Sequence, residues 1–460
     1  MDSVAFGLLV LFAAVAPILY GGHPGVQRTA FGDAGVTPTG HLALELSAFG
    51  IAAATLLSKF RLRALGPIGL PFGAILAIVL LGIVQLLPIP EPVLQRLGPV
   101  NLEIYHETAE ILGSFGQSSP PAPRISIAPW ETAGASLRVL AYAVLFASGV
   151  LLLRNRPRRR FLLGVVATTS VLQVLLAAAA EATSDRLHGL FASPNSFAGY
   201  LQIGAAVAFG GLWSELLTNA DRAQELTDPG ERLESRLRPL VGYVVIWGIV
   251  AIGIGLTRSR GGILAASVTT VLLLVLANFR WGSRARGRAS VVALAVAAGV
   301  LLAVATLRGA PLRRFLALDW RELRSETRFA IWERSVEAWR EFPVLGSGLG
   351  TFREAFRRVQ PREMDGLVEQ AHSDLLQMLV TGGTLGAALA VLAFGSLLVL
   401  LLRFFFRQRH REESAVVLAG IGALVALALH GLVEYNFSIP PIPATLACVV
   451  GAAWAAGRER

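Results

Sequence analysis

The sequence predicts an all-α integral membrane protein with about twelve transmembrane helices. The chain is 54% hydrophobic and only 16% charged, and its mean hydropathy is +0.60. Apolar windows long enough to cross a bilayer, which takes about 20 residues, recur along the chain. We therefore expect one bundle of helices joined by loops, rather than several soluble domains.

Each expected transmembrane helix is an apolar run that ends at charged residues, Pro or Gly. The runs cover residues 4–20, 41–58, 68–87, 133–153, 161–180, 195–213, 239–257, 261–278, 289–307, 380–402, 413–431 and 438–456. The first run follows an acid, Asp2, and has no basic segment before it, so we expect a first helix rather than a removed signal peptide. A shorter interfacial helix, Leu102 to Leu112, is expected within the polar, Pro-rich loop 88–132.

The distribution of basic residues predicts the orientation of the bundle. With a cytoplasmic N-terminus, both termini and most basic clusters fall inside, as the positive-inside rule requires. These clusters lie at 59–63, 154–160, 222–238, 280–288, 403–411 and 458–460. The net charge of +10 therefore indicates membrane topology rather than a nucleic-acid partner. The single cysteine, Cys448, excludes an intrachain disulfide and a cysteine metal site.

A short turn between two apolar helices carries Arg258 and Arg260 at the outer face. The turn needs glycine, which Gly261 and Gly262 supply, but it does not need two arginines on the side that the positive-inside rule disfavours. Guanidinium groups match phosphate oxygens in bidentate geometry. The pair is thus a candidate site for a lipid-linked phosphate or diphosphate. The alternative is that both side chains extend to phospholipid headgroups.

The long polar segment 308–371 separates the ninth and tenth expected helices and contains two helical patterns of its own. Phe329, Trp332, Val336 and Trp339 repeat at helical spacing, in a helix that ends before Pro343. A glycine turn at 346–350 follows, and Thr351 with Glu354 then resembles a capping box for a second helix. We expect a two-helix lid on the membrane surface. Its charged side chains are either functional or simply solvated.

His372 opens a segment in which leucines recur at helical spacing, and this predicts a histidine on the apolar face of a helix end. An imidazole can accept a proton from a hydroxyl near neutral pH, although a lone histidine in such a position is often structural. Asp374 is expected to point away from it. His430 and Glu434 stand four residues apart on one expected helix, a spacing that allows them to pair. For Arg186, Asn195 and Glu434 at the outer face we favour structural or supporting roles.

The chain resembles the O-antigen ligase and O-antigen polymerase superfamily of bacterial inner membranes over residues 190–385. Motifs in the expected order carry this likeness: Phe191–Ala198, Leu256–Gly262, Arg328–Trp332, Phe342–Phe352, and Ala371–Gln377 with Gly382 and Gly383. The segment Leu86–Pro90 is similar to members found in exopolysaccharide gene clusters.

The resemblance implies a polyprenol-dependent, GT-C-like membrane glycosyltransferase. It implies a ligase- or polymerase-like core at 191–456, with helices 1–190 as an N-terminal part. Such enzymes take a glycan from undecaprenyl diphosphate on the periplasmic face of the inner membrane, without a metal or other cofactor. Three classes of acceptor stay open: lipid A core, in lipopolysaccharide biosynthesis, another glycan repeat unit, or a protein hydroxyl. Position by position, the likeness carries over Arg260 with Arg258 beside it, Arg328, and His372.

The expected mechanism follows from a diphosphate leaving group. Fixed cations in a partly dry site stabilise the charge that develops on it, and Arg258, Arg260 and Arg328 are the candidates for binding it. Arg260, Arg328 and His372 are the candidate catalytic residues, with His372 as the base that gives inversion. Asn195, Trp332 and Glu434 are candidates for substrate contact or support.

Two other functions remain open at this point. One is a twelve-helix transporter of polysaccharides or solutes, which predicts ionisable residues at the centres of helices. The expected helix centres hold almost none. The other is a non-catalytic subunit of a polysaccharide-secretion complex, which would tolerate substitution of the outer arginines.

Overall fold

The computed structural model describes residues 2–19, 38–58, 69–116, 121–181, 184, 186–222, 229–281, 327–364 and 366–459. These residues form an all-helical fold without a β-strand, which confirms the predicted fold class. The helices of the bundle are α1 (Asp2–Leu19), α3 (Pro38–Leu57), α4 (Gly69–Leu86), α7 (Pro129–Leu152), α8 (Arg156–Ala180), α9 (Pro194–Arg222), α10 (Pro229–Leu256), α11 (Arg260–Trp281), α17 (Asp374–Arg407), α18 (Arg411–His430) and α19 (Pro441–Gly457). The expected helix 289–307 lies outside the described residues.

Eight of the described helices are long and apolar enough to cross a bilayer, and Leu42–Leu57 and Pro441–Gly457 are shorter apolar helices. The outward faces are apolar, as the side chains of Leu264, Val271 and Phe279 along α11 illustrate. In a soluble protein such surfaces would be exposed to water, whereas a bilayer covers them. The fold is that of a multi-pass membrane protein.

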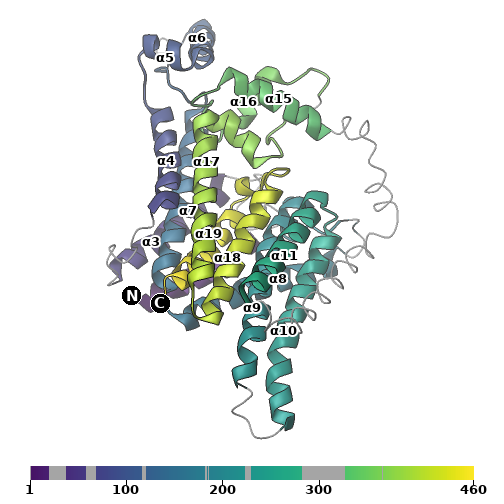
Figure 1. Ribbon diagram of the computed structural model, residues 1–460. Helices are drawn as coiled ribbons and strands as arrows, with labels where there is room; N and C mark the ends of the chain where they lie inside the picture. The colour runs from purple at the N-terminus through teal and green to yellow at the C-terminus, as the bar shows by residue number, and fades with distance from the viewer. Residues whose placement is uncertain are drawn as a thin grey trace.

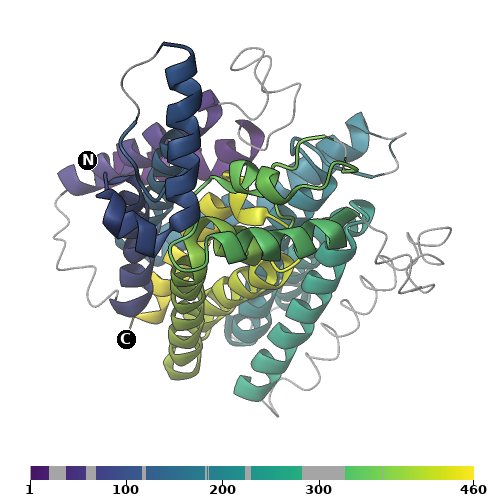
Figure 2. The same cartoon turned by 90° about the horizontal axis from the view of Figure 1, so that it is seen from above.

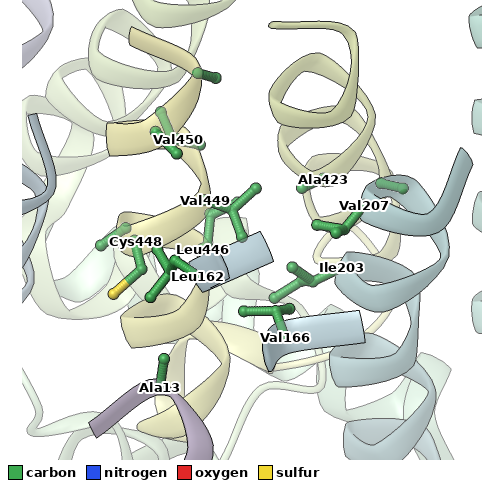
Figure 3. Close-up of a cluster of buried hydrophobic side chains, with 14 of the residues drawn as sticks. Ala13, Leu162, Val166, Ile203, Val207, Ala423, Leu446, Cys448, Val449 and Val450 are labelled. Atoms are coloured by element: carbon green, nitrogen blue, oxygen red, sulfur yellow. The ribbon is translucent and has the colours of Figure 1, made fainter. Parts of the chain in front are cut away.

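The centre of the bundle is built around α18, which packs most extensively against α9 and α19. Side chains from α1, α8, α9, α18 and α19 form one continuous apolar core (Figure 3). Small residues allow these backbones to approach closely. A Cβ added to Gly420 would lie 2.3 Å from the Cβ of Ala453 on α19.

Both chain termini lie at one end of the bundle (Figure 1). Asp2 pairs with Arg158 at 3.0 Å, and Glu459 pairs with Arg156 at 2.9 Å. At the same end, Arg280 Nη2 donates to the carbonyl of Gln408 at 2.8 Å. The described parts of the basic clusters 154–160, 280–288 and 403–411 therefore share the end that carries the termini, as the predicted topology requires.

The opposite end carries four short helices outside the apolar bundle (Figures 1 and 2). They are α5 (Glu91–Leu97), α6 (Pro99–Ser114), α15 (Thr327–Glu341) and α16 (Phe352–Val359). The interfacial helix expected at Leu102–Leu112 lies within α6. The two helices expected in the long loop are α15 and α16, and a small apolar core that includes Phe342, Phe356 and Val380 seats them on α17.

A break in α17 fixes the glycine turn beneath these two helices. Gly383 has φ +65° and ψ −170°, and backbone N–H groups beside it bond the chain just before the turn, with Thr384 N to Pro343 O at 2.8 Å. The buried amide of Gln85 donates to Leu345 O at 2.6 Å and accepts from Leu349 N at 2.9 Å. The turn is thus clamped between α4 and α17.

The predicted capping box at the start of α16 is wrong. Thr351 makes no side-chain bond to the first turn of α16. Its hydroxyl instead donates to Gly348 O at 2.6 Å and contacts Ser347 Oγ at 2.8 Å. The glycine turn offers closer acceptors than the helix, so the threonine stabilises the turn.

Candidate active site

Glu434 lies at the centre of a polar cluster at the end of the bundle opposite the termini. Its side chain is 2% exposed and comes from the segment between α18 and α19. One carboxylate oxygen, Oε2, accepts from Arg328 Nη2 at 3.1 Å, and Oε1 lies 3.2 Å from His372 Nδ1. One buried carboxylate therefore joins two residues that the sequence analysis identified separately.

The environment of Glu434 keeps its carboxyl group ionised. Burial alone would raise the pKa of Glu434, but the hydrogen bond from His372 and the charge of Arg328 outweigh burial, and the pKa lies below its ordinary value. A carboxylate can only accept hydrogen bonds, so Nδ1 of His372 carries the hydrogen. The other ring nitrogen, Nε2, then holds the free lone pair.

His372 stands before the helix rather than on its apolar face, which corrects the sequence-based expectation. It adopts a left-handed backbone conformation with φ +49°. Ser373 is the N-cap of α17 and accepts from Leu376 N. The next residue, Asp374, donates its backbone N–H to Gly431 O at 2.7 Å, and its Oδ1 accepts from Phe437 N at 3.1 Å. Asp374 thus holds the Glu434 segment against α17, and the partner of His372 is Glu434.

Tyr435 is a neighbour of His372 that the sequence analysis missed. The two rings meet edge to face, with centroids 5.0 Å apart. Burial raises the pKa of Tyr435 to about 12, and the charge of Glu434 adds to the rise. The phenol therefore stays protonated, which leaves His372 as the base in this pair.

Arg328 enters the cluster from the first turn of α15, the helix that also carries Trp332. Arg328 is 37% exposed, and besides Glu434 it contacts the carbonyl of Val433 through Nη1 at 3.3 Å. Trp332 lies one turn further along α15 and packs edge to face on Phe329, with centroids 5.1 Å apart. Its indole N–H is buried and bonds to none of the described residues. Of the two side chains, Arg328 contacts Glu434 directly and stays partly exposed.

The turn that carries Arg258 and Arg260 packs against the Glu434 segment. A Cβ added to Gly261 would lie 2.6 Å from Val433 Cγ2 and 3.4 Å from the His430 ring, so only glycine permits this approach. Gly262 N donates to Ser259 Oγ at 3.2 Å, which fixes the first turn of α11. Both arginine side chains are exposed. The structure thus brings this turn to the same place as His372 and Arg328.

Arg258 and His372 share an unusual backbone conformation. Of the described residues other than glycine, these are the two with positive φ, each at +49°. Such strain persists only where surrounding contacts impose it, and it concentrates at functional sites. The coincidence of both residues at one cluster supports a functional role for it.

Asn195, the remaining candidate, stands in the first turn of α9 and accepts from Arg186 Nη2 at 2.8 Å. Arg186 is a member of the cluster to which the sequence analysis gave only a supporting role. Its signal was a single arginine in a short outer loop, which many membrane proteins carry. No group of three or more His, Cys, Asp or Glu side chains in the described part of the chain is arranged to hold a metal ion.

The expected pair of His430 and Glu434 is wrong. Helix α18 ends at His430, with Gly431 as its C-cap, so the two residues do not share a helix. Glu434 bonds to His372 and Arg328, while Nδ1 of the buried His430 finds no partner among the described residues. Because α18 ends at His430, Glu434 stands in the segment after the helix, where its carboxylate reaches Arg328 on α15 and His372 before α17.

Residues 244–391 match the sequence family described as O-antigen ligase. The match covers about a third of the chain and contains Arg258, Arg260, Arg328, Trp332 and His372. Arg186, Asn195, Glu434 and Tyr435 lie outside it, and the tertiary structure alone brings them to the site. A search of the curated proteins finds no match to the chain.

Proposed function

We propose that this chain is a membrane glycosyltransferase of the O-antigen ligase and polymerase type, which transfers a glycan from undecaprenyl diphosphate to a hydroxyl group on the periplasmic face of the bacterial inner membrane. The match of residues 244–391 to the O-antigen ligase family supports this proposal. The observation that carries the proposal is the arrangement of His372, Glu434 and Arg328 beside the turn of Arg258 and Arg260. It combines an oriented base with cations suited to a diphosphate.

The base is His372, oriented by Glu434. Since Nδ1–H donates to the carboxylate, Nε2 accepts the proton of the acceptor hydroxyl. The acceptor oxygen then attacks the anomeric carbon from the face opposite the diphosphate. The bond from that carbon to the diphosphate oxygen breaks, undecaprenyl diphosphate leaves with the electron pair, and the configuration inverts.

The arginines stabilise the leaving group. Arg258 and Arg260 are exposed at the head of α11, where phosphate oxygens of a membrane-embedded donor would lie. Arg328 keeps part of its guanidinium open although Glu434 holds it. Fixed cations of this kind need little reorganisation as charge develops, and no metal takes part in this scheme. Trp332 supplies an aromatic face and an N–H group for a sugar.

The test is transfer by purified protein in nanodiscs, supplied with a defined undecaprenyl diphosphate glycan and either lipid A core or a second glycan as acceptor. For His372→Ala we expect the rate to fall by about 10²–10⁴-fold, the usual contribution of a general base. His410→Ala, an exposed histidine at the opposite end, is the matched control and should transfer as the wild type does. Wild-type rates in His372→Ala would contradict the assignment of the base.

The choice of acceptor separates a ligase from a polymerase, and the same assay tests the competing functions. Transfer to lipid A core would define a ligase, and elongation of a second repeat unit would define an exopolysaccharide or O-antigen polymerase. If the wild type transfers to neither acceptor but moves a glycan or solute across the bilayer, the protein is a transporter. If it does neither, it is a non-catalytic subunit.

A further inference from the structure

Arg186 is hydrogen-bonded to the residue that follows α10, next to the candidate diphosphate site. Its Nε donates to the carbonyl of Thr257 at 2.9 Å, and Leu187 N donates to Leu256 O at 3.1 Å. Thr257 immediately precedes Arg258 in the chain. The segment that carries Arg186 therefore runs alongside the turn that carries Arg258.

A second contact fixes the plane of the Arg186 guanidinium. Nη2 donates to Asn195 Oδ1 at 2.8 Å, from the first turn of α9. Both contacts are to neutral oxygens. They leave most of the N–H groups of the guanidinium available for a ligand. Arginine held in this way loses little freedom when it binds a phosphate, because its fork is already oriented.

The charge around Arg186 is unbalanced. Arg186 pairs with no carboxylate in the described part of the chain. Burial lowers the pKa of Arg186, and the charges of Arg328 and Arg258 lower it further, against the opposing effect of Glu434. Glu434, the carboxylate that acts on this group, is already bonded to Arg328 and His372. Half-buried cations that repel one another favour the binding of an anion between them.

We propose that Arg186 is a further binding residue of this site, which takes the second phosphate of a lipid-linked diphosphate, and that Asn195 and the Thr257 carbonyl position it. This inference rests on the proposed function and deepens it. Arg258 and Arg186 stand on adjacent segments and their charges act on each other, so we expect a diphosphate to engage both and a monophosphate to engage the turn alone. The site thus distinguishes a diphosphate donor from a monophosphate carrier.

The experiment measures binding of farnesyl diphosphate and farnesyl monophosphate to the purified full chain in phosphatidylcholine nanodiscs. We expect the wild type to bind the diphosphate more tightly. Arg186→Gln should weaken diphosphate binding by about 10–100-fold, the range for a charge-assisted hydrogen-bond pair, and change monophosphate binding little. Asn195→Ala should act in the same direction with a smaller loss. Arg353→Gln, an exposed arginine on α16 at the same end, is the matched control and should match the wild type.

Arg186→Lys serves if the glutamine variant fails to fold. It keeps the charge, but a lysine cannot hold Thr257 and Asn195 and still reach a phosphate, so diphosphate binding should again fall. A variant at Arg186 that loses affinity for both ligands equally, or for neither, overturns the proposal and leaves the proposed function standing. A wild type that does not bind farnesyl diphosphate overturns the donor class itself.

A final arm replaces part of the phosphatidylcholine with phosphatidylglycerol. If Arg186 serves the donor, the anionic lipid should weaken diphosphate binding equally in the wild type and in Arg186→Gln. Competition that disappears in Arg186→Gln would assign the residue to phospholipid headgroups and overturn the proposal.

Discussion

The two ends of the bundle each carry a cluster of charged side chains, and the clusters differ in how their charges are paired. At the end with the termini, Arg156 and Arg159 pair with Glu413 and Glu459; we call this the terminal cluster. At the other end, Arg186, Arg258 and Arg328 surround Glu434 and His372; we call this the site cluster.

In the terminal cluster each arginine has a carboxylate and the innermost groups are sealed. Arg159 is 1% exposed, Glu413 is 3% exposed, and they meet at 2.6 Å. In the site cluster the buried Glu434 is shared by Arg328 and His372, and Arg186 pairs with no carboxylate of the described residues. The cluster with paired charges stabilises the fold, whereas the cluster in which Arg328 and His372 share one carboxylate is suited to an anionic ligand.

The largest effect that separates the two clusters is expected from Glu413→Gln. It removes the buried carboxylate that pairs with Arg159, whose remaining partner, Glu459, is 31% exposed, and should lower the free energy of unfolding by about 3–5 kcal/mol. Transfer per folded molecule should stay as in the wild type. Thermal unfolding in detergent, with transfer assayed on the folded fraction, measures both. Lost transfer with unchanged stability would reverse the roles assigned to the two ends.

At the end that carries the site cluster, the glycine turn between α15 and α16 depends on backbone geometry, and Gly383→Ala should show this. A Cβ at this residue would lie 2.3 Å from Val344 O, at φ +65°. We expect a loss of about 2–4 kcal/mol from overpacking and left-handed strain together. The control is Gly395→Ala on the same helix, where a Cβ meets nothing within 4 Å and should be neutral or slightly stabilising. Equal unfolding temperatures for the two variants would show that the break in α17 does not require glycine at residue 383.

Titration distinguishes the clusters through Glu434. Because the folded pKa of Glu434 lies below its ordinary value of 4.5, the ionised group stabilises the fold above that pH, and the stabilisation is lost as pH falls through the lower folded pKa. Glu434→Gln should therefore be less stable than the wild type by about 1 kcal/mol at neutral pH, and the gap should close below about pH 4. Unfolding midpoints of both proteins across this range provide the measurement. A difference in stability that does not change with pH would mean that the contacts of Glu434 with Arg328 and His372 are not ionic.

The smallest effect is expected where charges pair in the open. Arg334 and Glu337 on α15 meet at 2.6 Å but are 38% and 37% exposed. Arg334→Ala should change the free energy of unfolding by no more than about 0.5 kcal/mol and leave transfer intact, because solvent screens the pair. A larger effect in either assay would extend the site along α15.

Much of the architecture was determined by the sequence itself, because its signals are local. The length of apolar runs predicted the helices, and the basic clusters predicted that both termini share one end. The periodicity of Phe329, Trp332 and Trp339 predicted α15. Arg258, Arg260 and His372 are candidates within their own short segments, and the resemblance to the ligase family adds Arg328.

What only the tertiary structure decided concerns contacts between distant segments. Glu434 stands 62 residues from His372, and no spacing rule connects them. Their spacing of four residues placed Glu434 and His430 on one helix. The spacing does not show where a helix ends, and α18 ends at His430. The place of Arg186 likewise depends on how α9 and α10 pack. The pattern of a helix specifies which of its faces is apolar. The packing of the helices against one another then decides which polar groups meet at their ends.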